Sequence, residues 1–282
     1  MLIQKLRRGL DNLMHNISYL LRRRLGASSD GETSQRNHDT YVLAQQLKDV
    51  LKYENIAPPP PKHLQMRVVM GYNADFIESG IHICADLDRV LAPTGKRLQD
   101  FNRILDFGCG CGRNSRALKF LCKNSEIVGS DIDGEAIQWL QDNYQSVGTF
   151  SQNAHRPPMD FPDNYFDFIF SISVLTHLPE DMQFEWLGEL QRIVKPGGYL
   201  ILTTHGTNHL NDLTNADRAV LEKNGFLYKA FAATDGLPDF YQVAYHTLDY
   251  IKEKWQPYFD VLAVVERGIA GRQDAVLLRK VP

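Results

Sequence analysis

The 282-residue sequence predicts an α/β fold built on a doubly wound, mostly parallel sheet. From Phe101 onward, short apolar runs alternate with amphipathic stretches, as in strands joined by right-handed helical crossovers. A glycine-rich turn joins the first of these strands to the first helix, where open α/β sheets bind nucleotide-type ligands. Two apolar runs near the C-terminus flank a glycine-containing turn and predict a hairpin.

Apolar periodicity gives the expected position of each element. Residues 62–92 predict two helices, joined near Gly71 and broken around Gly80. Proline and glycine in residues 195–198 (KPGG) end a helix and turn the chain into the next strand. We expect strands at 103–107, 126–131, 147–151, 166–171 and 198–204, helices at about 113–123, 134–145 and 180–194, and hairpin strands at 259–265 and 275–278.

The first 60 residues are expected to form a helical extension and linker, followed by the main domain over residues 61–282. Residues 1–25 carry six basic side chains and one acid, with apolar residues at helical spacing. Such a helix fits a peripheral membrane or protein contact through residues 2–25, and it fits a packing or oligomerisation helix equally well. A polar linker, a helix at 41–53 and a proline run at 58–61 follow.

Composition excludes several classes of protein. The net charge of -3 gives no support for nucleic acid as the main partner. No apolar run approaches the ~18 residues of a membrane-spanning helix. The four cysteines lack a disulfide-framework spacing or a nearby histidine pair, so we expect reduced thiols in a cytoplasmic protein and no metal site.

The glycine-rich turn, residues 106–112 (DFGCGCG), indicates which ligand binds. A dinucleotide fingerprint needs G-x-G-x-x-G, and the frames from Gly108 and Gly110 end instead at Arg113 and Ser115. The pattern present, acid-x-G-x-G-x-G, resembles the first motif of the class I S-adenosylmethionine-dependent methyltransferases. The resemblance implies that this turn binds S-adenosylmethionine through Asp106, Gly108, Cys109, Gly110 and Gly112.

Two later segments continue the resemblance. Asp131 ends the second strand, where an acid can accept hydrogen bonds from both ribose hydroxyls; Asp133 is the better helix N-cap. Asn153 stands where many relatives carry an acid, and its carboxamide is expected at the adenine edge beside the backbone N–H of Ala154. Ile132 and Ser171 belong to the same expected cofactor set.

Residues 101–206 as a whole resemble a small-molecule methyltransferase of the type 11/12 group. The resemblance implies a Rossmann-like, doubly wound, seven-stranded sheet, mostly parallel with an antiparallel C-terminal hairpin strand. It implies methyl transfer to a small-molecule or glycan acceptor, which we expect to occur on oxygen. The flanks of this segment resemble a bacterial subgroup often found among cell-surface saccharide genes, whose sequence pattern does not fix the substrate.

His177 and His205 are the candidate catalytic residues, because they follow the fourth and fifth strands at the ligand-binding edge. Either histidine can take a proton from an acceptor hydroxyl, or it can simply shape the pocket. Tyr241, Tyr245 and His246 are interpreted as facing the acceptor. Two alternative functions stay open: a non-catalytic docking module that binds S-adenosylmethionine, and a nicotinamide-dependent oxidoreductase.

Overall fold

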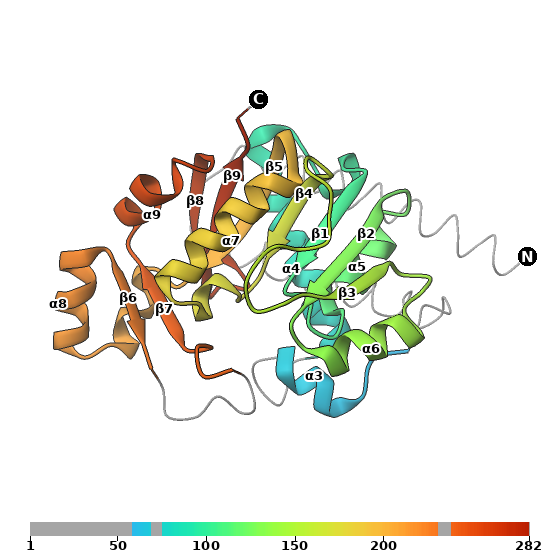
Figure 1. The fold of residues 1–282 in the computed structure, drawn as a ribbon, viewed down its shortest axis with the longest axis horizontal. Coiled ribbons are helices and arrows are strands. Elements are labelled where there is room, and N and C mark those ends of the chain that lie inside the picture. The colour runs from blue at the N-terminus through green and yellow to red at the C-terminus, as the bar shows by residue number, and fades with distance from the viewer. Residues whose placement is uncertain (1–57, 69–74, 231–237, 282) are drawn as a thin grey trace, which may run out of the picture. The chain divides into compact units, whose positions relative to one another are not determined.

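The structure, a computed structural model, describes residues 58–68, 75–230 and 238–281 (Figure 1). Contacts within the chain separate two units, Met1–Pro58 and Pro59–Pro282, and only the second is described. The basic helix expected over residues 2–25, the linker and the helix expected at 41–53 lie outside the described residues. The division of the chain near residue 60 therefore stays a prediction.

A seven-stranded sheet forms the centre of the described unit (Figure 1). In spatial order the strands are β3 (Thr149–Gln152), β2 (Glu126–Asp131), β1 (Arg103–Phe107), β4 (Phe166–Ser171), β5 (Val194–Thr204), β9 (Gln273–Arg279) and β8 (Asp260–Ile269). Strands β1 to β5 are parallel, and β9 is antiparallel to both β5 and β8. This topology confirms the predicted Rossmann-like, mostly parallel sheet with an antiparallel hairpin strand.

Helices cover both faces of this sheet. The helices are α3 (Lys62–Val68), α4 (Phe76–Leu91), α5 (Arg113–Leu121), α6 (Gly134–Asn143), α7 (Glu180–Ile193), α8 (Asn215–Asn224), α9 (Leu248–Trp255), and the 3₁₀ turns η1 (Ala92–Thr94), η2 (Leu98–Asp100), η3 (Leu175–His177) and η4 (Thr207–Asp212). The crossovers through α5 and α7 proceed in opposite directions along the sheet, so right-handedness places these helices on opposite faces. On the α7 face, Trp186 and Trp255 lie in the main apolar core.

Two of the expected element boundaries were wrong. Gly80 lies inside α4 rather than at a break, because the helix packs closely on α5 at this point: a Cβ on Gly80 would lie 2.4 Å from the Arg113 carbonyl oxygen. Strand β5 begins at Val194, within the segment interpreted as the end of a helix and a turn. Val194 pairs with Phe166 across a bulge, and this tertiary contact extends the strand.

The segment between β5 and β8 forms an insertion that the sequence did not resolve into strands. It contains η4, α8 and α9, and a separate two-stranded antiparallel sheet made of β6 (Phe226–Lys229) and β7 (Val243–His246). Two backbone hydrogen bonds attach this insertion to the segments that follow β4 and β5: the His246 N–H in β7 donates to the His205 carbonyl (2.9 Å), and the Gln242 N–H just before β7 donates to the His177 carbonyl in η3 (3.1 Å). The insertion therefore lies beside the carboxyl ends of β4 and β5 (Figure 1).

Candidate active site at the carboxyl edge of the sheet

The carboxyl ends of parallel strands meet at one edge of a sheet, and this edge collects most of the predicted site residues. The glycine loop follows β1, Asp131 ends β2, Ser171 ends β4 and His205 follows β5. Residues far apart in the sequence are thus brought to one edge by strand pairing alone.

The glycine loop is held by the end of β2. The N–H groups of Gly108 and Cys109 both donate to the Ser130 carbonyl, at 2.7 and 3.1 Å. The Gly110 N–H donates to Asp131 Oδ2 at 2.6 Å, while Asp131 Oδ1 accepts the N–H of Asp133 at 2.9 Å. Asp131 therefore fixes the loop and the start of α6 together, and each of its oxygens keeps a lone pair for a ligand.

The first two glycines of the loop, Gly108 and Gly110, lie where a side chain would not fit. Gly110 has φ +52°, and a Cβ there would lie 2.3 Å from Val68 Cγ1 at the end of α3. Gly108 has φ +80°, and a Cβ there would lie 2.2 Å from Val174 Cγ2. Both conformations are left-handed, and both glycines face a close neighbour, so side chains would displace the loop or its cover. Gly112, at the N-terminus of α5, is packed similarly against Leu140.

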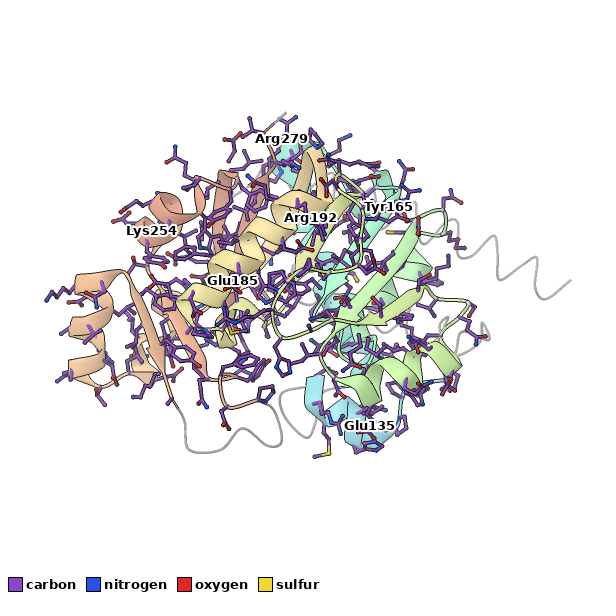
Figure 2. All side chains as sticks on the ribbon, viewed as in Figure 1. Glu135, Tyr165, Glu185, Arg192, Lys254 and Arg279 are labelled. Atoms are coloured by element: carbon purple, nitrogen blue, oxygen red, sulfur yellow. The ribbon has the colours of Figure 1, made fainter. Side chains whose placement is uncertain are left out.

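Helix α3 covers the glycine loop and is anchored to the start of α6. Arg67 pairs with Asp133 (2.7 Å) and Glu135 (2.5 Å), and His63 contacts the same Glu135 carboxylate at 2.9 Å; Glu135 is labelled in Figure 2. The thiol of Cys111 donates to the Leu64 carbonyl at 3.4 Å. These contacts hold α3 against the glycine loop and the start of α6.

Asp106, the first residue of the motif, lies beneath the loop in the protein interior. It is fully buried, and its Oδ2 accepts the hydroxyl of Ser115 on α5 at 2.7 Å. Burial raises the pKa of Asp106 to about 7, against the opposing effect of the Ser115 hydrogen bond. Its Oδ1 has no partner among the described residues. The contact that the structure shows for Asp106 is therefore with α5.

The expected adenine side of the site is built after β3. The Asn153 N–H donates to the Asp131 carbonyl (3.0 Å), and the Asn153 carboxamide accepts from Ser130 Oγ (2.6 Å) and donates to the Ala154 carbonyl (2.8 Å). An amide has two donor hydrogens and two acceptor lone pairs, so one of each stays available for a ligand. Ile132 supports this side by accepting from Gln152 through its carbonyl at 3.0 Å.

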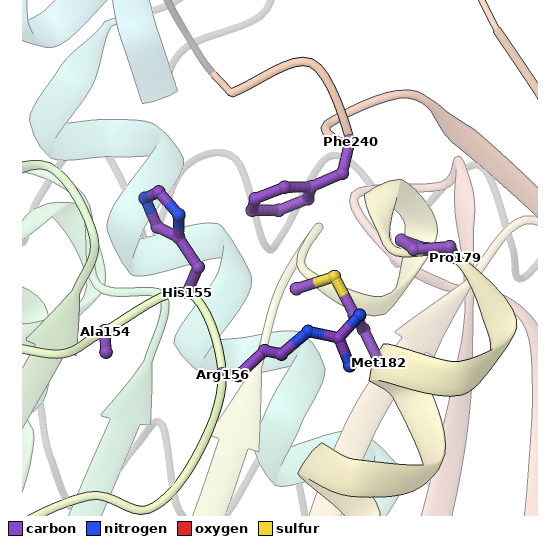
Figure 3. A pocket seen from close by; sticks show the side chains of 6 residues that line it. All are labelled: Ala154, His155, Arg156, Pro179, Met182 and Phe240. Atoms are coloured by element: carbon purple, nitrogen blue, oxygen red, sulfur yellow. The ribbon is translucent and has the colours of Figure 1, made fainter.

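A pocket of about 500 Å³ adjoins Ala154 (Figure 3). Both the His155 ring, from the loop after β3, and the Phe240 ring, from the segment before β7, point into it, with centroids 5.2 Å apart in an edge-to-face arrangement. Arg156 is held at its rim by Asp181 at 2.6 Å. The sequence interpretation named only Ala154 here. Phe240 was missed because its approach to the loop depends on the insertion.

His177 is oriented by the insertion. Its Nδ1 lies 2.6 Å from the Gln242 carbonyl oxygen, and because a carbonyl only accepts, Nδ1 carries the hydrogen and Nε2 keeps its lone pair. Burial lowers the pKa of His177, and the bond to Gln242 opposes this shift. The side chain is therefore a neutral imidazole at pH 7, with its basic nitrogen turned away from Gln242.

Tyr241 contacts both His177 and Ser173. Its ring stacks on His177 with centroids 4.3 Å apart and planes at 17°. The hydroxyl donates to the Ser173 carbonyl at 3.2 Å. Burial raises the pKa of Tyr241, and the negative charge of Asp131 raises it further, so the two side chains are electrostatic neighbours. Tyr241 is therefore a protonated phenol stacked on His177.

His205 lies beside His177 with ring centroids 6.1 Å apart. Burial, followed by the neighbouring His209 and His177, lowers the pKa of His205 to about 3. Tyr245 packs on the same ring at 5.7 Å. His246, also expected to face the acceptor, is instead buried and hydrogen-bonded through Nε2 to Gln183 at 2.8 Å. His246 thus belongs to the packing between the insertion and α7.

Ser171 is the last residue of β4, and Ser173 lies in the bend that follows it. The Ser171 hydroxyl is buried and has no partner among the described residues. Ser173, which the sequence interpretation did not name, has φ +62° and is held by the Thr203 hydroxyl, which accepts its N–H at 2.9 Å. A left-handed serine at this edge is a strained position that local sequence does not signal.

The described residues contain neither a metal-binding cluster nor a membrane-spanning helix. No group of three or more His, Cys, Asp or Glu side chains in residues 58–68, 75–230 and 238–281 is arranged to hold a metal ion. In the same part of the chain, no helix combines the length and apolar character needed to cross a membrane.

Comparison with known proteins agrees with the fold. Residues 105–202 match the family model described as a methyltransferase domain. A fatty-acid O-methyltransferase of Mycolicibacterium smegmatis is 26% identical over 36% of this chain and 36% of that protein. A ubiquinone/menaquinone biosynthesis C-methyltransferase of Coxiella burnetii is 28% identical over 50% of this chain and 57% of that protein.

The solved structure of an S-adenosylmethionine-dependent methyltransferase from Clostridium acetobutylicum has the same fold, with a TM-score of 0.51 at 11% identity. The similarity covers 74% of this chain and 94% of that one. The matches to the first curated relatives span 36% to 64% of the relatives' own lengths.

Proposed function

We propose that this chain, whose residues 105–202 match a methyltransferase domain, is a class I S-adenosylmethionine-dependent methyltransferase that methylates a small-molecule acceptor. The observation that supports this most is the Asp131 carboxylate at the end of β2, which holds the Gly110 N–H and keeps lone pairs for ribose hydroxyls. Unlike a dinucleotide, S-adenosylmethionine has no pyrophosphate, which fits a loop without the G-x-G-x-x-G spacing.

The residues of the edge fit this cofactor. Asp131 would hold the ribose, and Asn153 and the Ala154 backbone would hold the adenine. The loop from Gly108 to Gly112 would lie against the amino-acid end, with Ile132 and Ser171 completing the set. The loop glycines leave no room for side chains, and Asn153 keeps one free N–H and one free lone pair, as a nucleoside ligand requires. When bound, the cofactor supplies an electrophilic methyl group.

We assign His177 as the candidate base and oxygen as the methylated atom. The bond from Nδ1 to Gln242 fixes the tautomer that leaves Nε2 unprotonated, ready to take a proton from an acceptor hydroxyl. His205 is a much weaker base, because its pKa is lowered to about 3. The relatives include both O- and C-methyltransferases by name, so the support for oxygen comes from His177.

The acceptor is proposed to be a small molecule, with a saccharide as the specific candidate. The test is transfer of tritium from methyl-labelled S-adenosylmethionine into separated lipid, saccharide and small-molecule fractions. We expect label in a fraction that contains hydroxylated small molecules, and inhibition by S-adenosylhomocysteine. Tight binding of S-adenosylhomocysteine without transfer to any fraction would favour the non-catalytic docking module instead.

A peripheral membrane role for residues 2–25 is a separate proposal for a cytoplasmic enzyme. It rests on the six basic residues and the apolar periodicity of a segment that lies outside the described residues. We expect the full chain to float with anionic vesicles at low salt and to be released at high salt, because screening weakens attraction to anionic lipid. The matched deletion of residues 2–25 should not float and should keep its affinity for S-adenosylhomocysteine. Absence of flotation for the full chain at low salt would contradict this proposal.

A further inference from the structure

His205 and Gln273 lie at the same end of the β5–β9 strand pair. These strands pair antiparallel as far as Thr204 opposite Asp274, and His205 and Gln273 are the next residues beyond that last pair. The His205 ring lies 4.3 Å from the His209 ring, and His209 Nε2 lies 3.1 Å from the carbonyl oxygen of Arg272, which precedes Gln273. His205 and Gln273 therefore belong to one part of the carboxyl edge, although the sequence separates them widely.

Each of these side chains has one buried polar atom without a partner. Gln273 donates through Nε2 to the Ser173 hydroxyl at 2.7 Å, and its Oε1 has no partner among the described residues. The Nδ1 atom of His205 is also buried and without a partner there. Buried polar atoms are nearly always hydrogen-bonded in native proteins, so two such atoms at the same end of the β5–β9 strand pair indicate a site for a bound group.

Both atoms are hydrogen-bond acceptors. The amide oxygen of Gln273 can only accept. His205 makes a hydrogen bond with the Ala244 backbone that favours its protonated form, as a bond to a carbonyl does. Since Nδ1 has no partner, this bond comes from Nε2–H, and the neutral ring then carries a lone pair on Nδ1.

The pair is continuous with the site built around His177. Gln273 contacts the Ser173 hydroxyl, and the Ser173 carbonyl accepts from Tyr241, which stacks on His177. His205 itself lies beside His177. The strained backbone of Ser173 is held from three sides by these contacts and by Thr203. Both side chains thus belong to the network of contacts around His177.

We propose that His205 Nδ1 and Gln273 Oε1 bind hydroxyl or amino hydrogens of the methyl acceptor, so the acceptor presents at least two such hydrogens there and does not present a carboxylate. This inference rests on the proposed function and specifies its substrate class. A carboxylate at neutral pH offers only lone pairs and would leave both buried atoms unpaired. Sites built to bond a substrate hydroxyl strongly reject analogues that cannot donate.

Ligand-observed NMR on the full chain, saturated with S-adenosylhomocysteine, tests this class. The probes are two size-matched pairs: catechol against benzoate, and cis-1,2-cyclohexanediol against cyclohexanecarboxylate. We expect at least one diol to bind about tenfold or more tightly than its carboxylate partner. Equal affinities, a preference for the carboxylates, or binding of none of the four probes would overturn the proposal.

Substitutions at His205 and Gln273 test whether the diol binds at these two side chains. Gln273→Leu and His205→Leu should each weaken the diol by about 3- to 10-fold, the worth of one hydrogen bond. His205→Asn should retain binding, because its Oδ1 can occupy the place of Nδ1. Gln138→Leu, on the exposed face of α6, is the matched control and should change nothing. Unchanged diol affinity in both leucine variants would show that the probe binds elsewhere and would also overturn the proposal.

Calorimetry with S-adenosylhomocysteine separates this inference from the function on which it rests. If the wild-type chain does not bind S-adenosylhomocysteine, the proposed function fails. If it binds, and the leucine variants bind it equally well but the diol preference is absent, only the acceptor class is wrong. Should Gln273→Leu fail to fold, the His205→Leu and His205→Asn pair carries the same comparison.

Discussion

Replacing His177 by alanine is expected to lower turnover by ~100- to 10,000-fold while leaving cofactor affinity nearly intact, because a positioned base contributes this much to proton transfer. The structure fixes His177 as a neutral imidazole with Nε2 free to accept a proton. Its pKa is lowered from the ordinary value of 6.5 by burial, so wild-type turnover should rise with a midpoint below pH 6.5 and stay level through neutral pH. Steady-state rates of methyl transfer across pH 5 to 8 measure both effects.

The His177→Asn variant is the matched control for this prediction. An asparagine amide can occupy the place of Nδ1 and donate to the Gln242 carbonyl, but it has no basic nitrogen at the place of Nε2. If His177 is a base, asparagine should be as inactive as alanine, and the low-pH rise should disappear from the residual activity of both variants. Recovery of most activity by asparagine, with a raised KM in alanine alone, would indicate that His177 only shapes the pocket.

Replacing Asp131 by alanine is expected to weaken S-adenosylhomocysteine binding by ~10- to 100-fold, the worth of a charge-assisted hydrogen bond. The loss has two sources: the proposed contact with the ribose hydroxyls, and the Gly110 N–H, which donates to Asp131 at 2.6 Å in the structure. Isothermal titration calorimetry measures it. Asp142→Ala, which removes an exposed carboxylate from α6, is the control and should retain full affinity. An unchanged Kd for Asp131→Ala would exclude the ribose assignment.

The sheet was predictable because its signals are local. The strands that carry Asp106, Asp131 and Ser171 each appear as a short apolar run, and the glycines of the first loop specify its turn directly. The exceptions are positions where a tertiary contact overrides the local pattern. Gly80 stays helical because it packs against α5, and Val194 is in a strand because it pairs with β4.

The acceptor side of the site was less predictable, because it is assembled from distant segments. His177 was identified from its place after β4, but its tautomer depends on Gln242, which arrives with the insertion. The β6–β7 strand pair of this insertion shows no clear alternation of apolar and polar residues in the sequence. Likewise, Gln273 and His205 come to the same end of the sheet only through the antiparallel pairing of β9 with β5.

We expect this edge of the sheet to bind S-adenosylmethionine rather than a nicotinamide dinucleotide. The most direct measurement is calorimetric titration of the full chain with S-adenosylhomocysteine and, separately, with NAD. We predict one-to-one binding of S-adenosylhomocysteine and no measurable heat of binding with NAD, because the loop lacks the spacing that binds a pyrophosphate. Binding of NAD without binding of S-adenosylhomocysteine would contradict the account.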